Sequence, residues 1–174
     1  MRSGKCHQPG LFDKVPESNK VLDISVLLSN VHIDSIERFD QLFAEYIART
    51  IVIICCTTNS MVDLARADKI RKRSAVINLN SMTGLHPARH YNIYSASKAY
   101  IYQQTRCMSR EYNKIDFISA HPSELSTAMT NNKPINIWTL KTNRCVGWTL
   151  NDLAKGYIQT EGRWKHKGQS LLTA

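Results

Sequence analysis

Residues 75–98 of this chain read AVINLNSMTGLHPARHYNIYSASK. The apolar beginning of this stretch predicts a buried strand, and the small polar residues after it predict a loop. The end of the stretch opens a predicted helix that carries Tyr94 and Lys98. Because these residues are four positions apart, their side chains are expected on one helix face, with Ser81 thirteen residues upstream of Tyr94. The stretch therefore predicts a strand–loop–helix unit that presents a hydroxyl, a phenol and an ammonium.

The rest of the chain alternates strands with helices. Strands are predicted at residues 25–29, 75–79 and 115–120, and helices at residues 12–21, 39–71, 92–112 and 149–158. Strands that alternate with helices are typical of a parallel sheet, so the predicted fold class is α/β. At 174 residues the chain has the length of one domain.

The Tyr94–Lys98 pair suits proton transfer to a carbonyl group. A phenol ordinarily ionises near pH ~10, and a neighbouring cation lowers that pKa. A hydroxyl that gives or takes a proton near neutral pH is what carbonyl reduction requires. The Ser81 hydroxyl would then hold the substrate oxygen. Tyrosine and lysine at this spacing are also common on surface helices, so the alternative is a strand and a helix without catalytic duty.

The strand that ends at Ser81 and the helical Y-x-x-x-K sequence resemble the active site of the short-chain dehydrogenase/reductase family. Residues 25–31 (SVLLSNV) are similar to the fourth strand of that family, and residues 115–122 (IDFISAHP) are similar to its sixth. Residues 126–130 and 160–166 resemble one branch, the 17-beta-hydroxysteroid dehydrogenases and very-long-chain 3-oxoacyl-CoA reductases.

This resemblance implies a partial Rossmann-like, doubly wound parallel sheet in residues 11–174, after an extension at residues 1–10. It also implies that Tyr94 is the acid, that Lys98 tunes it, and that Ser81 holds the carbonyl oxygen. The implied cofactor is NADP(H). The positions that would contact it by resemblance are Asn30, Lys98, Pro122 and Thr127.

Several departures from the family pattern bear on activity. Family members have a glycine-rich turn between a first strand and a helix, where the backbone approaches the dinucleotide phosphates, and none of the seven glycines here forms such a cluster. The sheet is therefore expected to lack its first strands. Ile54 stands where the family has a catalytic asparagine, and isoleucine cannot form side-chain hydrogen bonds. His32 and Ser123 replace two family glycines.

These departures favour a degenerate, non-catalytic structural or accessory subunit of a larger assembly, with no cofactor bound by this chain alone. The alternative is an NADP-dependent oxidoreductase that reduces a ketosteroid or a 3-oxoacyl-CoA. In that case another chain would supply the nucleotide-binding half. Saturable NADPH binding separates the two hypotheses.

The strand at residues 25–29 bears on partners, because without the first family strands it would lie at the edge of the sheet. The strand is nearly all apolar at residues 24–28 and has no lysine or proline to discourage pairing. Other protein chains are therefore expected to cover it. A homodimer through the two long helices is the other arrangement that the resemblance implies.

Composition sets further limits. The five cysteines are odd in number and lack C-x-x-C spacing, which argues against disulfides and zinc and favours a reducing, intracellular compartment. The six histidines suggest no metal site. The formal charge of +9 includes a basic cluster at residues 66–73 that is expected to be a solvated helix end, without a specific nucleic-acid motif. The longest apolar run, residues 51–56, is too short to cross a membrane.

Overall fold

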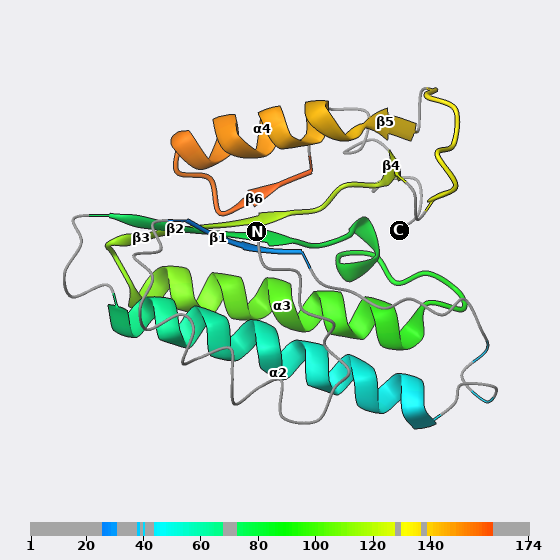
Figure 1. Ribbon diagram of the computed structural model, residues 1–174, viewed down its shortest axis with the longest axis horizontal. Helices are drawn as coiled ribbons and strands as arrows, with labels where there is room; N and C mark the ends of the chain where they lie inside the picture. The colour runs from blue at the N-terminus through cyan, green and yellow to red at the C-terminus, as the bar shows by residue number, and fades with distance from the viewer. Residues whose placement is uncertain are drawn as a thin grey trace.

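The computed structural model of the chain describes residues 26–30, 38, 40, 44–67, 73–127, 130–136 and 139–161, with only the backbone at residues 62–67. The predicted extension at residues 1–10 and the predicted helix at residues 12–21 lie outside the described residues. The described part contains three layers, with a parallel sheet between helices (Figure 1).

The central sheet is parallel, as predicted. Its strands are β1 (Val26–Ser29), β2 (Ser74–Leu79), β3 (Ile115–Ala120) and β6 (Gln159–Thr160), and they lie side by side in that order. Val26 pairs with Ala75, and Ser74 pairs with Ile115. β6 was not predicted, because it has only two residues and no apolar run.

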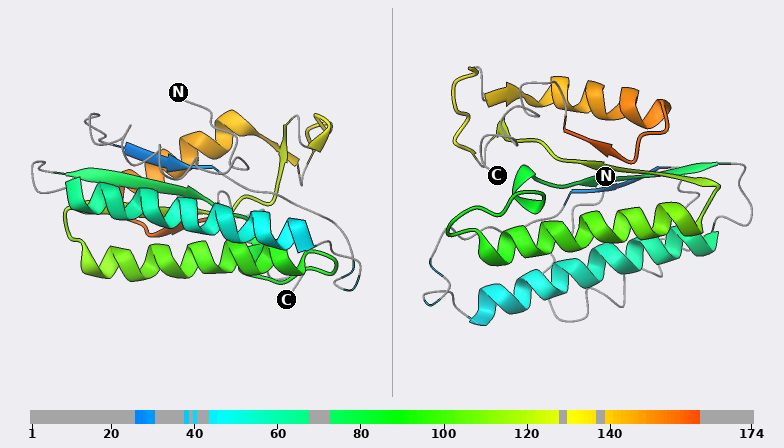
Figure 2. Two further views of the ribbon diagram at one scale, coloured as in Figure 1. Left: turned by 60° about the horizontal axis from the view of Figure 1, so that its bottom comes forward. Right: turned by 180° about the vertical axis from the view of Figure 1, so that it is seen from behind.

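The two long predicted helices lie together on one face of the sheet. They are α2 (Ala44–Ala67) and α3 (Asn92–Glu111), and both views in Figure 2 place them side by side. A third helix, α4 (Thr142–Ala154), covers the opposite face above β3 and β6 (Figure 1).

The predicted final helix at residues 149–158 is wrong in its bounds. α4 begins at Thr142 and ends before Gly156, whose φ of 76° lies in the left-handed region. Glycine is a poor helix former, but the space around Gly147 is open and the helix passes through it. The structure also adds a small parallel sheet of β4 (Glu124–Ser126) and β5 (Thr139–Lys141).

Apolar side chains from α2, α3 and the sheet form the core between them. The buried cluster consists of Met61, Val76, Met108, Ile115 and Phe117. A polar pair, Asn78 and Thr105, is fully buried nearby, and the Asn78 side-chain nitrogen donates to the Thr105 hydroxyl at 2.7 Å. Because an unpaired buried amide is costly, this bond fixes where α3 lies along β2.

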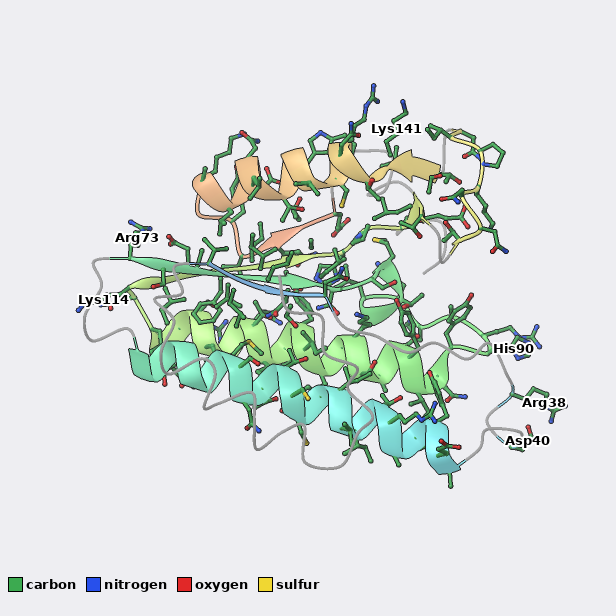
Figure 3. The ribbon with its side chains drawn as sticks, in the orientation of Figure 1. Arg38, Asp40, Arg73, His90, Lys114 and Lys141 are labelled. Atoms are coloured by element: carbon green, nitrogen blue, oxygen red, sulfur yellow. The ribbon has the colours of Figure 1, made fainter. Side chains whose placement is uncertain are left out.

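The strands begin and end at opposite sides of the molecule. Arg73 and Lys114 mark the amino ends of β2 and β3, and His90 lies toward the other end, before α3 (Figure 3). Arg73 forms two bonds of 2.7 Å with the carboxylate of Asp116 and is exposed. This member of the predicted basic cluster is thus a solvated surface residue.

Replacing the buried hydroxyl in the Thr105→Val variant tests the polar pair. The substitution conserves shape and leaves the Asn78 amide nitrogen without its hydroxyl partner, so we expect a loss of about 1–3 kcal/mol in the free energy of unfolding. Urea denaturation measures the loss, and Thr142→Val at an exposed position of α4 is the control. Equal stabilities of the two variants would contradict a structural role for the pair.

Candidate active site

Ser81 lies two residues after the end of β2, at the start of a short helical turn. Its extended backbone, with φ of −148°, caps the 3-10 helix η2 (Met82–Gly84). Its Oγ accepts a hydrogen bond from the Thr83 backbone N–H at 3.3 Å and another from the Thr83 hydroxyl at 3.1 Å. In both bonds the Ser81 oxygen accepts, so its own hydroxyl hydrogen can still be donated. The side chain is half-buried and is held at the carboxyl end of the sheet.

Lys98 is the most deeply buried cation in the part of the chain with described side chains. It is 3% exposed, and its Nζ donates to the Leu79 backbone carbonyl at 3.0 Å. Burial lowers the pKa of this ammonium to about 8. Gly84 lets η2 pack closely against α3, because a Cβ at position 84 would lie only 2.9 Å from the Lys98 Cβ.

Tyr94 lies next to Lys98 on α3, as the four-residue spacing predicts. The Lys98 Nζ is 5.7 Å from the centre of the Tyr94 ring, within the range of a cation–π contact. The ring also packs at 5.9 Å from the ring of Tyr91, with 60° between their planes. Tyr94 is half-buried, so one part of it is accessible to a small molecule while the rest faces protein.

The structure therefore brings the predicted trio to one region of the molecule. Tyr94 and Lys98 are adjacent, and the Leu79 carbonyl that binds Lys98 is two residues before Ser81. The catalytic roles of the three remain predictions. Their arrangement provides a phenol beside a buried positive charge and a serine hydroxyl at the end of the strand that holds this charge.

Sequence reasoning missed two polar residues that support the trio. His121 follows β3, is fully buried, and has its Nδ1 3.1 Å from the Ser81 carbonyl oxygen. Asn80 is also buried, and its side-chain amide contacts the Ser119 hydroxyl at 2.8 Å. The available signal was their position, since polar residues at the carboxyl ends of neighbouring buried strands meet at one edge of a parallel sheet.

Two of the predicted cofactor residues, Asn30 and Pro122, lie at the same edge. Asn30 is exposed directly after β1, and Pro122 is buried after β3, where its carbonyl accepts from the Met82 backbone N–H at 3.2 Å. Thr127 follows β4, and its backbone N–H donates to the Thr130 hydroxyl at 2.9 Å. This edge is where α/β proteins bind ligands in general, and cofactor binding at these residues stays a prediction.

The positions that depart from the family pattern can be placed in part. Ile54 lies in the middle of α2 with a half-buried side chain, and its backbone carbonyl accepts from the Thr58 hydroxyl at 2.9 Å. Ser123 is half-buried between β3 and β4. His32 lies outside the described residues. The hydrocarbon side chain of Ile54 therefore offers no bond to a water or to the lysine.

The histidines, cysteines and acidic residues of the described part of the chain form no group of three that could hold a metal ion. None of the helices in the described ranges is both long and apolar enough to span a membrane.

The sequence profile of the short chain dehydrogenases matches residues 11–137. The chain belongs to this family. The 17-beta-hydroxysteroid dehydrogenase type 3 of Mus musculus is 29% identical over 132 residues, which are 71% of this chain and 43% of that protein. The very-long-chain 3-oxoacyl-CoA reductase of Bos taurus is 27% identical over 109 residues, or 59% of this chain and 34% of that protein. The chain thus spans less than half the length of these relatives, and the predicted resemblance to this branch is confirmed.

Solved structures of short-chain dehydrogenases share the fold. A 7beta-hydroxysteroid dehydrogenase superposes with a TM-score of 0.83 at 20% identity, over 94% of this chain and 67% of that one. A short-chain dehydrogenase from Sphingobium yanoikuyae, solved in complex with NADPH, gives a TM-score of 0.80 at 19% identity, over 91% of this chain and 65% of that one. The predicted Rossmann-like parallel sheet is confirmed.

The burial of Lys98 predicts a rise in stability with pH. Its pKa is about 8 in the folded chain and 10.5 for an ordinary lysine, so between these values the unfolded chain binds more protons. The free energy of unfolding should therefore increase by up to roughly 3 kcal/mol across this interval, relative to a Lys98→Met variant that lacks the titrating group. Urea denaturation at several pH values measures it.

The exposed Lys114 provides the control for this experiment. Lys114→Met should leave the pH dependence of wild-type stability unchanged. If the free energy of unfolding depends on pH in the same way for wild type and Lys98→Met, the Lys98 ammonium is not buried.

Proposed function

We propose that the described residues form the proton-donating and substrate-holding part of an NADP-dependent ketone reductase site. The observation that carries this proposal is the buried Lys98 ammonium beside the ring of Tyr94. An ammonium taken out of water costs free energy, and here the bond to the Leu79 backbone carbonyl and the neighbouring ring help to offset that cost. A positive charge held beside a phenol favours the phenolate and so eases proton release.

Each member of the trio has a distinct role in this proposal. Tyr94 donates its phenolic proton to the oxygen of the substrate carbonyl as that oxygen becomes an alkoxide. Lys98 stabilises the phenolate that remains. The Ser81 hydroxyl, whose hydrogen is not used in its bonds with Thr83, donates to the same substrate oxygen and orients the carbonyl.

The residues present fit one end of the implied cofactor. Asn30 and Pro122 follow β1 and β3, Thr127 follows β4, and Lys98 reaches the end of β2 from α3. In this proposal these four residues hold the nicotinamide ribose end. NADPH supplies a hydride when it is bound. The diphosphate end needs a glycine turn that residues 1–174 do not contain. In this proposal another polypeptide supplies that turn.

The substrate class follows from the relatives. The two described above are named for hydroxysteroids and for very-long-chain 3-oxoacyl-CoA, which both carry a ketone or a secondary alcohol at the reacting carbon. We therefore propose a ketosteroid or a 3-oxoacyl-CoA as the substrate.

Turnover by the Tyr94→Phe variant tests the proposed acid. With NADPH and a ketosteroid or 3-oxoacyl-CoA, and with the native partner chains present, the variant should lose about 100- to 10,000-fold in kcat because the proton donor is removed. Oxidation of NADPH, followed by absorbance, measures the rate. Tyr91→Phe is the matched control, since Tyr91 packs against Tyr94 and keeps the ring contact as phenylalanine. Full activity of Tyr94→Phe would refute the proposal.

A second candidate function is a non-catalytic accessory subunit of a larger assembly, and two observations favour it. Ile54 occupies the place of the family's catalytic asparagine with a side chain that forms no hydrogen bond. β1 is the outermost strand of the described sheet, and its Val26 and Leu28 side chains, on one face, are 54% and 53% exposed. Apolar residues on an edge strand favour association with another chain. The exposed Ile51 and Tyr100 on the long helices support a homodimer as the other arrangement.

A charged residue in β1 tests this accessory role. Leu28→Lys should abolish or strongly reduce recovery of the chains that co-purify with tagged wild-type protein, because the ammonium would be desolvated in the interface. Val146→Lys, at a similarly exposed apolar residue of α4, is the control and should not change recovery. The accessory role is wrong if Leu28→Lys retains every partner at wild-type yield.

A further inference from the structure

His121 lies where β3 ends, between Ser81 and a small cavity. The residue is fully buried. Its backbone N–H donates to the Thr160 carbonyl at 2.8 Å, which ties it to β6. Its ring meets the ring of Tyr102 edge-on, with centres 4.7 Å apart and planes at 87°. The end of β3, the neighbouring strand β6 and the helix α3 thus all fix the position of this imidazole.

The bond to Ser81 determines which ring nitrogen carries hydrogen. The His121 Nδ1 is 3.1 Å from the Ser81 carbonyl oxygen, which can only accept. Nδ1 must therefore be the donor, and in the neutral ring Nε2 then presents a lone pair. Burial lowers the pKa of His121 to about 4; the Ser81 carbonyl opposes this and the nearby Lys98 charge adds to it. The ring is neutral over the physiological range.

On its other side, His121 lines a cavity of about 10 Å³ together with Glu161, Thr149 and Thr160. The His121 Nε2 and the Glu161 Oε2 are both buried, and neither has a hydrogen-bond partner among the described residues. The other Glu161 oxygen, Oε1, accepts from the Gln159 side-chain nitrogen at 2.8 Å. Gln159 Oε1 in turn accepts from the Tyr102 hydroxyl.

The two unpartnered atoms cannot satisfy each other, because a lone pair and a carboxylate oxygen both accept. A water molecule has two hydrogens to donate and can serve both at once. A cavity of this size is about what one water needs, and buried waters characteristically bond polar groups that lack protein partners. The chemistry and the volume of the cavity therefore point to the same ligand.

We propose that His121 is a positioning residue for Ser81. One buried water, shared with Glu161, donates a hydrogen bond to the His121 Nε2 and so stabilises the Nδ1–H tautomer. The hydrogen bond from His121 to the Ser81 carbonyl then fixes the backbone of Ser81, and with it the direction in which the Ser81 hydroxyl points toward substrate. The consequence for catalysis rests on the proposed reductase function, whereas the tautomer and the water site do not.

Nitrogen-15 NMR of histidine-labelled, full-length protein tests the tautomer directly. The His121 signal, identified by its loss in His121→Asn, should show a protonated Nδ1 and an unprotonated Nε2, and should not titrate near the ordinary histidine pKa of ~6.5. An Nε2–H tautomer, or titration near that value, would overturn the proposal.

A cross-peak from a bound water to the Thr149 or Thr160 hydroxyl is expected in wild type and should vanish in Glu161→Leu, whose side chain fills the cavity. The absence of such a cross-peak in wild type would overturn the shared water.

Variants of His121 test its action on Ser81. In His121→Asn the side-chain amide can still donate to the Ser81 carbonyl, whereas His121→Leu removes the donor. Hydrogen exchange of the Thr83 amide, which Ser81 Oγ caps, should accelerate about 5-fold in His121→Leu and stay near wild type in His121→Asn. Ile118→Val, at a fully buried position of the same strand, controls for general loosening of the core. Equal exchange rates of the Thr83 amide in His121→Asn and His121→Leu would refute the positioning role of His121. If His121→Leu does not fold, the tautomer seen by NMR in wild type decides whether the proposal holds.

The same proteins assayed for ketone reduction separate this inference from the proposed function. A lack of turnover by wild type with its native partners, alongside the Nδ1–H tautomer and protected Thr83, would refute the reductase and leave the positioning of Ser81 intact. A wild-type reductase whose His121→Leu variant keeps full kcat/KM would refute the positioning role and leave the reductase intact.

Discussion

The site depends on one buried charge. The Lys98 ammonium lies under the carboxyl end of β2, where the Leu79 carbonyl accepts its hydrogen bond. Moving an ammonium out of water is costly, so its surroundings must be held closely enough to keep the compensating contacts. Gly84 shows how close they are, since a methyl group there would collide with the Lys98 Cβ. The turn after β2, the helix α3 and the strand end are therefore constrained by a single side chain.

A set of buried polar pairs extends this constraint across the sheet. Asn78 bonds Thr105 between β2 and α3, and Asn80 bonds Ser119 between β2 and β3. His121 adds a bond to the Ser81 carbonyl. Apolar packing alone tolerates small shifts of a helix along a sheet, whereas a buried donor must find its acceptor. These pairs hold Ser81 and Lys98 in a defined relation, whichever function the site serves.

The two functional readings rest on different parts of the same structure. The trio and its buried charge are what a reductase needs to donate a proton to a ketone. Ile54 suits a chain without catalytic duty, and the exposed Val26 and Leu28 suit a chain that associates with others. Association with a partner is compatible with the reductase if that partner covers β1 and also brings the glycine turn, because the edge strand and the residues proposed to hold the cofactor would then be completed together. The family relationship itself does not depend on this choice.

The sequence alone determined the parallel sheet, the two long helices and the adjacency of Tyr94 and Lys98, because apolar periodicity and a four-residue helical spacing are local properties. It did not determine the bounds of α4, whose predicted start at Thr149 omitted residues 142–148, most of them exposed. β6 and the small β4–β5 sheet escaped prediction because such short strands are stabilised by their neighbours. The burial of Lys98 and the role of His121 were decided only by the tertiary structure. Both depend on strand ends that are far apart in sequence and meet at one edge of the sheet. Burial at this edge lowers the pKa of the lysine and of the histidine.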